Sequence, residues 1–226
     1  MHRNQSSLRP VASRASKAVS RREVLATGAL AGLVGGVASA VSLPLFGDRA
    51  QAAPPMTKAD DLKILNTALY YEHQAIWAYG FAASKLTNTE VGKAVLAVAL
   101  ANQADHKKHR DVLMTAVQQL GGQPTMAASS YDLSAYINRG EGNIDNDVNI
   151  AKLALALETD AAIAYGQEVA KLKTPALVTA GASIGATESA HAAAIRAAFN
   201  ALGVKIPVVP ASFIDASTRD AWVLKV

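Results

Sequence analysis

The 226-residue chain has no cysteine, few aromatic residues (5%) and only 18% charged residues. Without cysteine it has no disulfides, no thiolate ligands for a metal and no cysteine ligands for an iron–sulfur cluster. Half of the residues are hydrophobic, and many of these are alanine, which favours long, closely packed helices over a sandwich of sheets. The length suits one folded domain with a sizeable core.

Positive charge is concentrated in the N-terminal segment. Residues 1–52 contain seven Lys/Arg and two Asp/Glu, so the rest of the chain has 15 basic and 16 acidic residues, a net charge of −1. After residue 52 there is no basic helix and no interleaving of basic and aromatic residues. We therefore expect no nucleic-acid partner.

The first 52 residues have the features of an export signal. Ser20-Arg21-Arg22-Glu23-Val24-Leu25 leads into a mildly hydrophobic run that ends at Phe46, and Ala50-Gln51-Ala52 offers a small-residue cleavage site. This segment resembles a bacterial twin-arginine signal. The resemblance implies a twin-arginine export machinery as partner, cleavage after residue 52, and a periplasmic or secreted protein. An uncleaved membrane anchor is the alternative, because about 20 apolar residues span a bilayer.

The remaining sequence predicts four long helices, because apolar residues recur at helical spacing between capping residues and helix breakers. Their expected ranges are about 58–86, 90–120, 145–173 and 174–202. The first and third links are short, so the helices that they join must be antiparallel neighbours. The middle link is long enough to run the length of a bundle.

These elements predict an all-α fold, a four-helix bundle of two antiparallel hairpins joined by a long crossover. The bundle is expected over residues 53–203, with a short crossover helix near 131–137. Residues 204–226 show no regular period, and we expect them to pack on the bundle as a C-terminal tail.

The two predicted hairpins also resemble each other. Aligning Glu72 with Glu158 aligns an Ala-Tyr-Gly tripeptide that starts six residues further along in each copy. Aligning His109 with His191 aligns a Leu-Gly pair eleven residues further along. This similarity indicates a duplicated helix hairpin, each copy of which is unable to bury its apolar face alone.

Ionisable residues fall on helix faces that should be buried. Glu188 and His191 lie one turn apart on the apolar face of the fourth helix, where isolated charges are expensive. Glu-x-x-His directs an oxygen and a nitrogen to the same side, where one metal ion can bind both. A metal-free buried ion pair is the alternative.

When the glutamates and histidines of all four predicted helices are taken together, the chain resembles the ferritin-like superfamily. There, glutamates on the first and third helices and Glu-x-x-His on the second and fourth hold two metal ions. The opening Asp61-Leu62-Lys63-Ile64-Leu65-Asn66 and the twin-arginine start resemble those of the exported ferritin-like domain proteins of bacteria, which are related to the desiccation-associated group. The metal ligands that this resemblance implies are Glu72, His106, His109, Glu158, Glu188 and His191.

His106 departs from the superfamily pattern, which has a glutamate at this position. Such a glutamate usually bridges the two metals, and an imidazole does not bridge as a carboxylate does. Three carboxylates against two divalent ions also leave a formal charge of +1. The sequence therefore leaves open whether one or two ions bind, and whether they are iron or manganese, with zinc not excluded.

Four more residues are expected to contact the ligands rather than the metal: Asp105, Thr187, Tyr79 and Tyr165. Asp105 is placed to orient His191, and Thr187 is its counterpart in the second hairpin. The two tyrosines could donate hydrogen bonds near the site or simply fill the core. His73 lies off the buried face and is expected at the surface.

The resemblance implies that the protein oxidises ferrous iron or consumes peroxide at this centre. The alternatives are a non-enzymatic structural or stress-related bundle with a degraded metal site and, if the signal is retained, a membrane-associated helical scaffold. We identify no catalytic residue and no organic cofactor site, because the chain has no phosphate-binding loop and no Ser/His/Asp triad. A homo-oligomer is compatible with the sequence, but no spacing indicates one.

Overall fold

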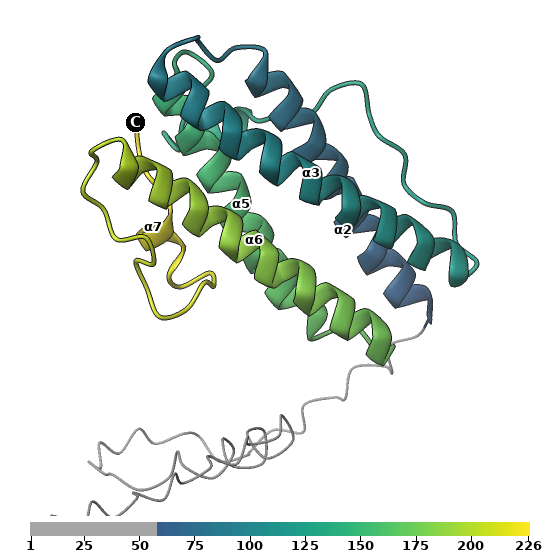
Figure 1. The fold of residues 1–226 in the computed structure, drawn as a ribbon. Coiled ribbons are helices and arrows are strands. Elements are labelled where there is room, and N and C mark those ends of the chain that lie inside the picture. The colour runs from purple at the N-terminus through teal and green to yellow at the C-terminus, as the bar shows by residue number, and fades with distance from the viewer. Residues whose placement is uncertain (1–57) are drawn as a thin grey trace, which may run out of the picture. The chain divides into compact units, whose positions relative to one another are not determined.

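The computed structural model describes residues 58–226, and the predicted export signal lies outside them. The four long helices are α2 (Lys58–Ala83), α3 (Glu90–Gln119), α5 (Asp147–Val169) and α6 (Pro175–Ala201). Two short helices, α4 (Ser134–Asn138) and α7 (Arg219–Trp222), complete the described part, which contains no strand (Figure 1). None of these helices is long and apolar enough to cross a membrane. The predicted all-α four-helix bundle is confirmed.

Local chemistry sets the helix ends. Thr89 caps α3 by accepting a hydrogen bond from the Gly92 amide, and Asn146 caps α5 in the same way. The predicted end of the first helix was three residues too late. The helix ends at Ala83 because the amides of Ser84 and Lys85 donate to carbonyls three residues back instead of four. The hydroxyl of Ser84 also donates a hydrogen bond to the carbonyl of Phe81.

Helices α2 and α3 pack as one hairpin, and α5 and α6 as the other. The two larger apolar clusters of the core lie at different levels of the bundle. One includes Leu65, Leu69, Leu113, Val117 and Ile184. The other includes Val95, Ile150, Leu155, Ile195, Phe199 and Trp222. The buried glutamates and histidines of the predicted metal site lie at levels between these two clusters in α3, α5 and α6, and Glu72 directly follows the first cluster in α2. The candidate site therefore lies in mid-bundle.

The crossover between the hairpins runs along α2. Thr125 donates through its amide and hydroxyl to the Asn66 side chain, at 2.7 and 3.0 Å. Its carbonyl oxygen lies 3.0 Å from Nε2 of His73, which is buried. The prediction that His73 lies at the surface was therefore wrong, because the crossover covers this side of α2. The crossover helix begins at Ser134, slightly later than predicted.

The C-terminal tail packs on one end of the bundle. Ile206, Ile214 and Trp222 join the apolar cluster there. The buried Arg196 of α6 donates hydrogen bonds to the carbonyls of Pro207 and Trp222, at 2.9 and 2.5 Å. The tail is therefore held by apolar contacts and by an arginine that reaches it from inside the bundle.

Glu141 anchors the tail electrostatically. Its buried carboxylate accepts two hydrogen bonds from Arg219, at 2.7 and 2.8 Å, and others from Arg139 and Lys225. The hydrogen bonds from Arg219, followed by those from Arg139 and Lys225, outweigh burial and hold the pKa of Glu141 below its usual range. A depressed pKa gives stability that is present above the unfolded-state pKa and lost as the pH falls towards the folded-state pKa.

We expect Glu141→Gln to lower the free energy of unfolding at pH 7 by about 3 kcal/mol, because it removes the charge of a buried carboxylate that Arg219, Arg139 and Lys225 share. The difference from wild type should shrink as the pH falls below about 4.5. Urea unfolding at pH 7 and pH 3.5 measures both. Glu168→Gln, which removes an exposed pair with Lys171, is the control and should cost at most about 1 kcal/mol. An equal loss at both pH values for Glu141→Gln would contradict this role.

Candidate metal centre

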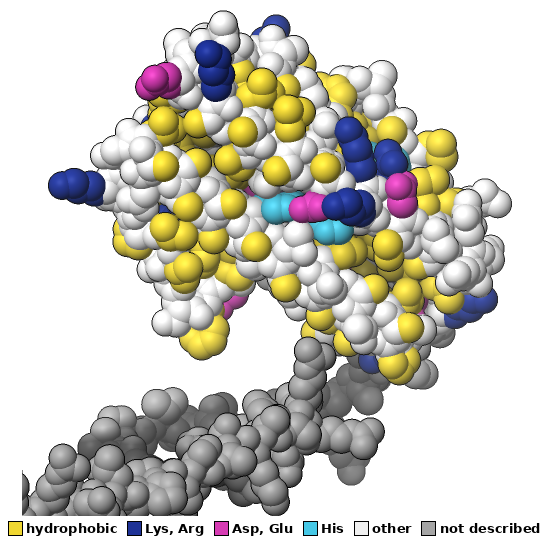
Figure 2. Space-filling view, in the orientation of Figure 1, with side chains coloured by type: hydrophobic (Ala, Val, Ile, Leu, Met, Phe, Trp, Pro, Cys, Tyr) yellow, Lys and Arg dark blue, Asp and Glu magenta, His cyan; other side chains and the backbone are white. Residues whose placement is uncertain are grey.

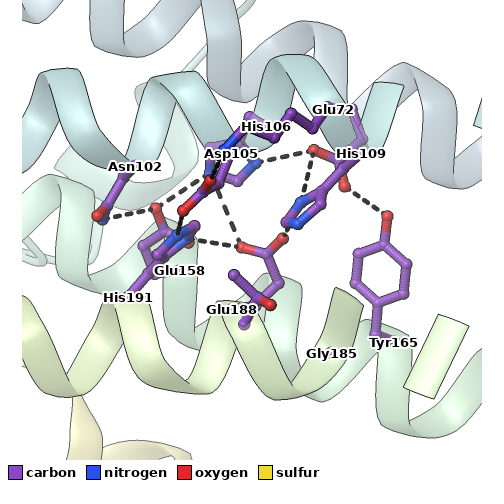
Figure 3. Close-up of polar contacts among 12 residues, drawn as sticks. Glu72, Asn102, Asp105, His106, His109, Glu158, Tyr165, Gly185, Glu188 and His191 are labelled. Atoms are coloured by element: carbon purple, nitrogen blue, oxygen red, sulfur yellow. Dashed lines mark hydrogen bonds and ion pairs between the residues drawn. The ribbon is translucent and has the colours of Figure 1, made fainter. Parts of the chain in front are cut away.

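The six ionisable residues singled out in the sequence lie together in the middle of the bundle (Figure 3). Each of the four long helices contributes, α3 and α6 with two residues spaced by three, which places both on one helix face. All six side chains are buried, with Glu188 completely inaccessible. They are Glu72, His106, His109, Glu158, Glu188 and His191.

Glu72, His109 and Glu188 form one half of the cluster. Nδ1 of His109 lies 2.9 Å from Oε1 of Glu188 and 3.7 Å from Oε2 of Glu72. With His106, these residues offer four potential ligand atoms within 4.8 Å of one another. This spacing is compatible with a single ion bound among them.

Glu158, His191 and Glu188 form the other half. Nδ1 of His191 lies 3.3 Å from Oε2 of Glu158 and 3.2 Å from Oε2 of Glu188. Together with His106, these residues make a second group of four atoms within the same 4.8 Å limit. Glu188 and His106 therefore belong to both groups.

His106 lies between the two halves. Its Nδ1 is 2.8 Å from Oε2 of Glu72, and its Nε2 is 3.1 Å from Oε1 of Glu158. Nε2 also lies 3.8 Å from Oε2 of Glu188. Each ring nitrogen thus faces a carboxylate of a different hairpin.

The carboxylates favour protonated histidines in the metal-free cluster. Burial alone would lower the histidine pKa values, but neighbouring glutamates outweigh it and raise them to about 11 for His106, about 9 for His109 and about 10 for His191. Burial also acts on the carboxyl groups. It raises the pKa of Glu188, whereas for Glu158 the charge of His106 overcomes burial and holds the pKa well below its usual range.

The two predicted tyrosines reach the cluster from opposite hairpins. Tyr79 of α2 donates a short hydrogen bond to Glu158 of α5. Tyr165 of α5 donates to Oε1 of Glu72 in α2, at 2.5 Å. Burial and these carboxylates raise the pKa of both phenols well above the usual range, so both remain hydrogen-bond donors.

Of the other two predicted contacts, Asp105 lies next to a ligand histidine and Thr187 does not. Oδ2 of Asp105 is 3.5 Å from Nε2 of His191, and the same half-exposed carboxylate pairs with Lys108. The structure does not bring Thr187 to the cluster, because its hydroxyl donates to the carbonyl of Ser183 in its own helix. A threonine inside a helix commonly makes this bond.

Asn102 is a member of the cluster that the sequence reasoning missed. Its buried side-chain amide donates to the hydroxyl of Tyr79 at 3.0 Å and to Oε1 of Glu158 at 3.3 Å. Asn102 lies one turn before His106 on the face that also carries His109. The spacing i, i+4, i+7 was thus the signal that could have found it.

One pair of atoms tests whether a metal fits. Nδ1 of His109 and Oε1 of Glu188 are only 2.9 Å apart, yet in the part of the chain that the structure describes they are buried polar atoms without a hydrogen-bond partner. Such atoms are rare in folded proteins and call for an explanation. A divalent cation would bind both, and mixed oxygen and nitrogen ligands suit iron, manganese or zinc. The residues therefore fit a metal centre.

Solvent comes close to the centre on the side of α3 and α6. Figure 2, seen from that side, shows histidine side chains beside acidic and basic ones at the surface. The side chains of His109 and His191 keep small exposed fractions, 11% and 7%, next to the exposed Lys108 and half-exposed Asp105.

A cavity of about 390 Å³ lies against the other side, between α2 and α5. Its walls are mostly apolar and rich in alanine, including Ala68, Ala75, Ala78, Ala154, Ala161 and Ala164. Its polar lining includes Glu72, Glu158, Tyr79, Tyr165 and His106. Small side chains on both helices thus leave open a cavity that reaches the carboxylates of the cluster.

A four-helix bundle with carboxylates and histidines converging in its core defines the ferritin-like class of proteins. The chain belongs to the ferritin-like domain family, which matches residues 60–201. This confirms the resemblance to the ferritin-like superfamily seen in the sequence.

Among solved structures, the chain is similar to a conserved hypothetical protein, rv2844, from Mycobacterium tuberculosis. The identity is 20% and the TM-score 0.53, over 65% of this chain and 99% of that one. At this identity the likeness shows the fold alone. No match is found among curated proteins.

The raised histidine pKa values predict how metal-free stability depends on pH. A raised pKa gives stability that is complete below the unfolded-state value of about 6.5 and is lost as the pH rises through the folded-state value. With EDTA present, the free energy of unfolding should therefore fall between pH 7.5 and 8.5.

His109→Gln should reduce that slope by about one proton per molecule. Urea unfolding at several pH values measures the slope. Thr187→Ala changes a side chain that has no ionisable group and bonds within its own helix, and it should leave the slope unchanged. If His109→Gln also left it unchanged, the cluster histidines would not be protonated in the metal-free protein.

Proposed function

We propose that this protein binds iron or manganese in the core of its bundle, through a carboxylate–histidine centre of one or two ions. The observation that carries the proposal is the convergence of three glutamates and three histidines from four helices. The buried His109 and Glu188 atoms without a hydrogen-bond partner support it, because a cation would satisfy both. Zinc has the same ligand preferences and is a further candidate.

Within this proposal, bound iron or manganese supplies redox chemistry, either oxidation of ferrous iron or consumption of peroxide. The protein's residues hold and orient the ligands. Tyr165 fixes Oε1 of Glu72, which leaves Oε2 to face His106 and His109. Tyr79 fixes Oε1 of Glu158, which also faces His106, while Oε2 faces His191. Asp105 orients the ring of His191 from the solvent side.

We also propose export by the twin-arginine machinery to the periplasm or beyond, on the basis of the paired arginines and the small-residue cleavage site. Expression in an exporting host tests this proposal. We expect a cleaved protein that begins near Ala53, and Arg21→Lys with Arg22→Lys should block export. A full-length protein retained in the membrane would favour an anchored scaffold instead.

A non-enzymatic structural bundle is the second candidate. It is favoured by the contacts of His106, which lies within hydrogen-bond distance of carboxylates on both hairpins without any metal. Elemental analysis separates the two candidates. The mature protein should be purified without chelator or affinity metal and, if empty, reloaded anaerobically. If the protein contains no metal as purified and binds none on reloading, the structural role is the candidate that stands.

Glu188→Ala combined with His191→Ala should abolish metal binding, because it removes ligands from both halves of the cluster. In wild type, metal at a hundredfold excess over its dissociation constant should add about 2.7 kcal/mol to the free energy of unfolding. The double variant should show no such gain. Elemental analysis and thermal unfolding with and without metal measure both effects. Asp111→Ala, on the exposed face of α3, is the control and should behave as wild type.

The cavity between α2 and α5 is the proposed route by which small molecules reach the centre. Ala161→Phe, which fills part of it, should slow peroxide consumption or ferrous oxidation severalfold without changing the metal content. Ala194→Phe adds the same ring on the exposed side of α6 and should leave the rate unchanged. Equal rates in both variants would show that reactants arrive by another route.

A further inference from the structure

Two residues divide their atoms between the two halves of the cluster (Figure 3). Glu188 directs Oε1 towards His109 and Oε2 towards His191, at 2.9 and 3.2 Å. His106 does the same with its ring, with Nδ1 next to Glu72 and Nε2 next to Glu158. Every other member of the cluster belongs to one half only.

Because these two residues are shared, both halves offer the same set of potential metal-ligand atoms. The first half has Glu72, His109, one oxygen of Glu188 and Nδ1 of His106. The second half has Glu158, His191, the other oxygen of Glu188 and Nε2 of His106. Each half therefore offers two oxygens and two nitrogens, a set that suits a divalent transition metal.

Charge favours the same arrangement. Three glutamates carry −3 against the +4 of two divalent ions. An imidazole ring that binds a metal through each nitrogen has given up both ring protons to solvent and carries −1. The four residues then carry −4 and balance two divalent ions. The charge excess expected for histidine at position 106 disappears if its ring bridges.

We propose that His106 is the second bridging ligand of a two-metal centre, with one ring nitrogen on each ion and Glu188 as the first bridge. This inference rests on the proposed metal-binding function. It goes further because it specifies two ions and gives a role to His106, the residue at which the chain departs from its family. The opposite arrangement is a protonated His106 that separates Glu72 from Glu158 and takes the place of an ion.

The first test is structural and uses the wild-type protein, loaded anaerobically with Mn²⁺. Elemental analysis gives the number of ions, and a crystal structure or X-ray absorption gives their separation. We expect two ions per chain about 6 Å apart, because a whole ring lies between them with metal–nitrogen bonds of about 2.1 Å. Two-metal centres without such a spacer are typically about 3.5–4 Å apart.

The second test uses matched variants of position 106. His106→Glu restores the family's carboxylate and should keep two ions while shortening their separation to about 4 Å. His106→Gln offers only one metal-binding oxygen and should bind the second ion at least tenfold more weakly. His73→Gln, outside the cluster, should match wild type in both respects. Circular dichroism checks that each variant is folded.

The possible outcomes distinguish failure of the histidine bridge from failure of the proposed metal-binding function. Two ions about 4 Å apart in wild type would overturn the histidine bridge and leave the metal-binding function intact. A single ion per chain in wild type, or full loading of His106→Gln, would also overturn the bridge. No bound metal in any variant would remove both the bridge and the proposed function.

Discussion

Six ionisable side chains are buried in mid-bundle between two apolar clusters, and the rest of the structure depends on how they neutralise one another. An unpaired buried charge costs several kcal/mol, and breaking one buried pair can cost about as much as half of a domain's stability. The carboxylates on α2 and α5 therefore have to meet the imidazoles on α3 and α6 at one level. This requirement fixes how far each helix is displaced along its neighbours, which apolar contacts alone would specify less strictly.

The duplication explains why neither hairpin is complete alone. The tyrosine of each copy bonds the glutamate of the other, Tyr79 to Glu158 and Tyr165 to Glu72. A single hairpin would leave a phenol and a carboxylate without these partners and would expose its apolar face. Polar and apolar contacts thus select the same pairing of hairpins, a consistency typical of natural folds.

Helices and cluster could be predicted from the sequence because both depend on local spacing. The apolar period and the caps define four helices, and glutamates or histidines on buried faces then have to meet in the core. Contacts set by distant segments could not be predicted in this way. His73 is buried by Thr125 of the crossover, and Arg219 reaches Glu141 across 78 positions. Thr187 failed as a cluster member because its own helix offered a nearer acceptor.

Histidine at position 106 suits the protein in two states. Without metal, protonated His106 joins His109 and His191 to face three carboxyl groups. A glutamate there would instead place four carboxyl groups against two histidines. With two ions bound, the same ring can supply the fourth negative charge. The fold is therefore stabilised before metal arrives, which agrees with the proposed twin-arginine route, because that route carries proteins that have already folded. In this view the departure from the family pattern is a means of keeping an empty centre stable.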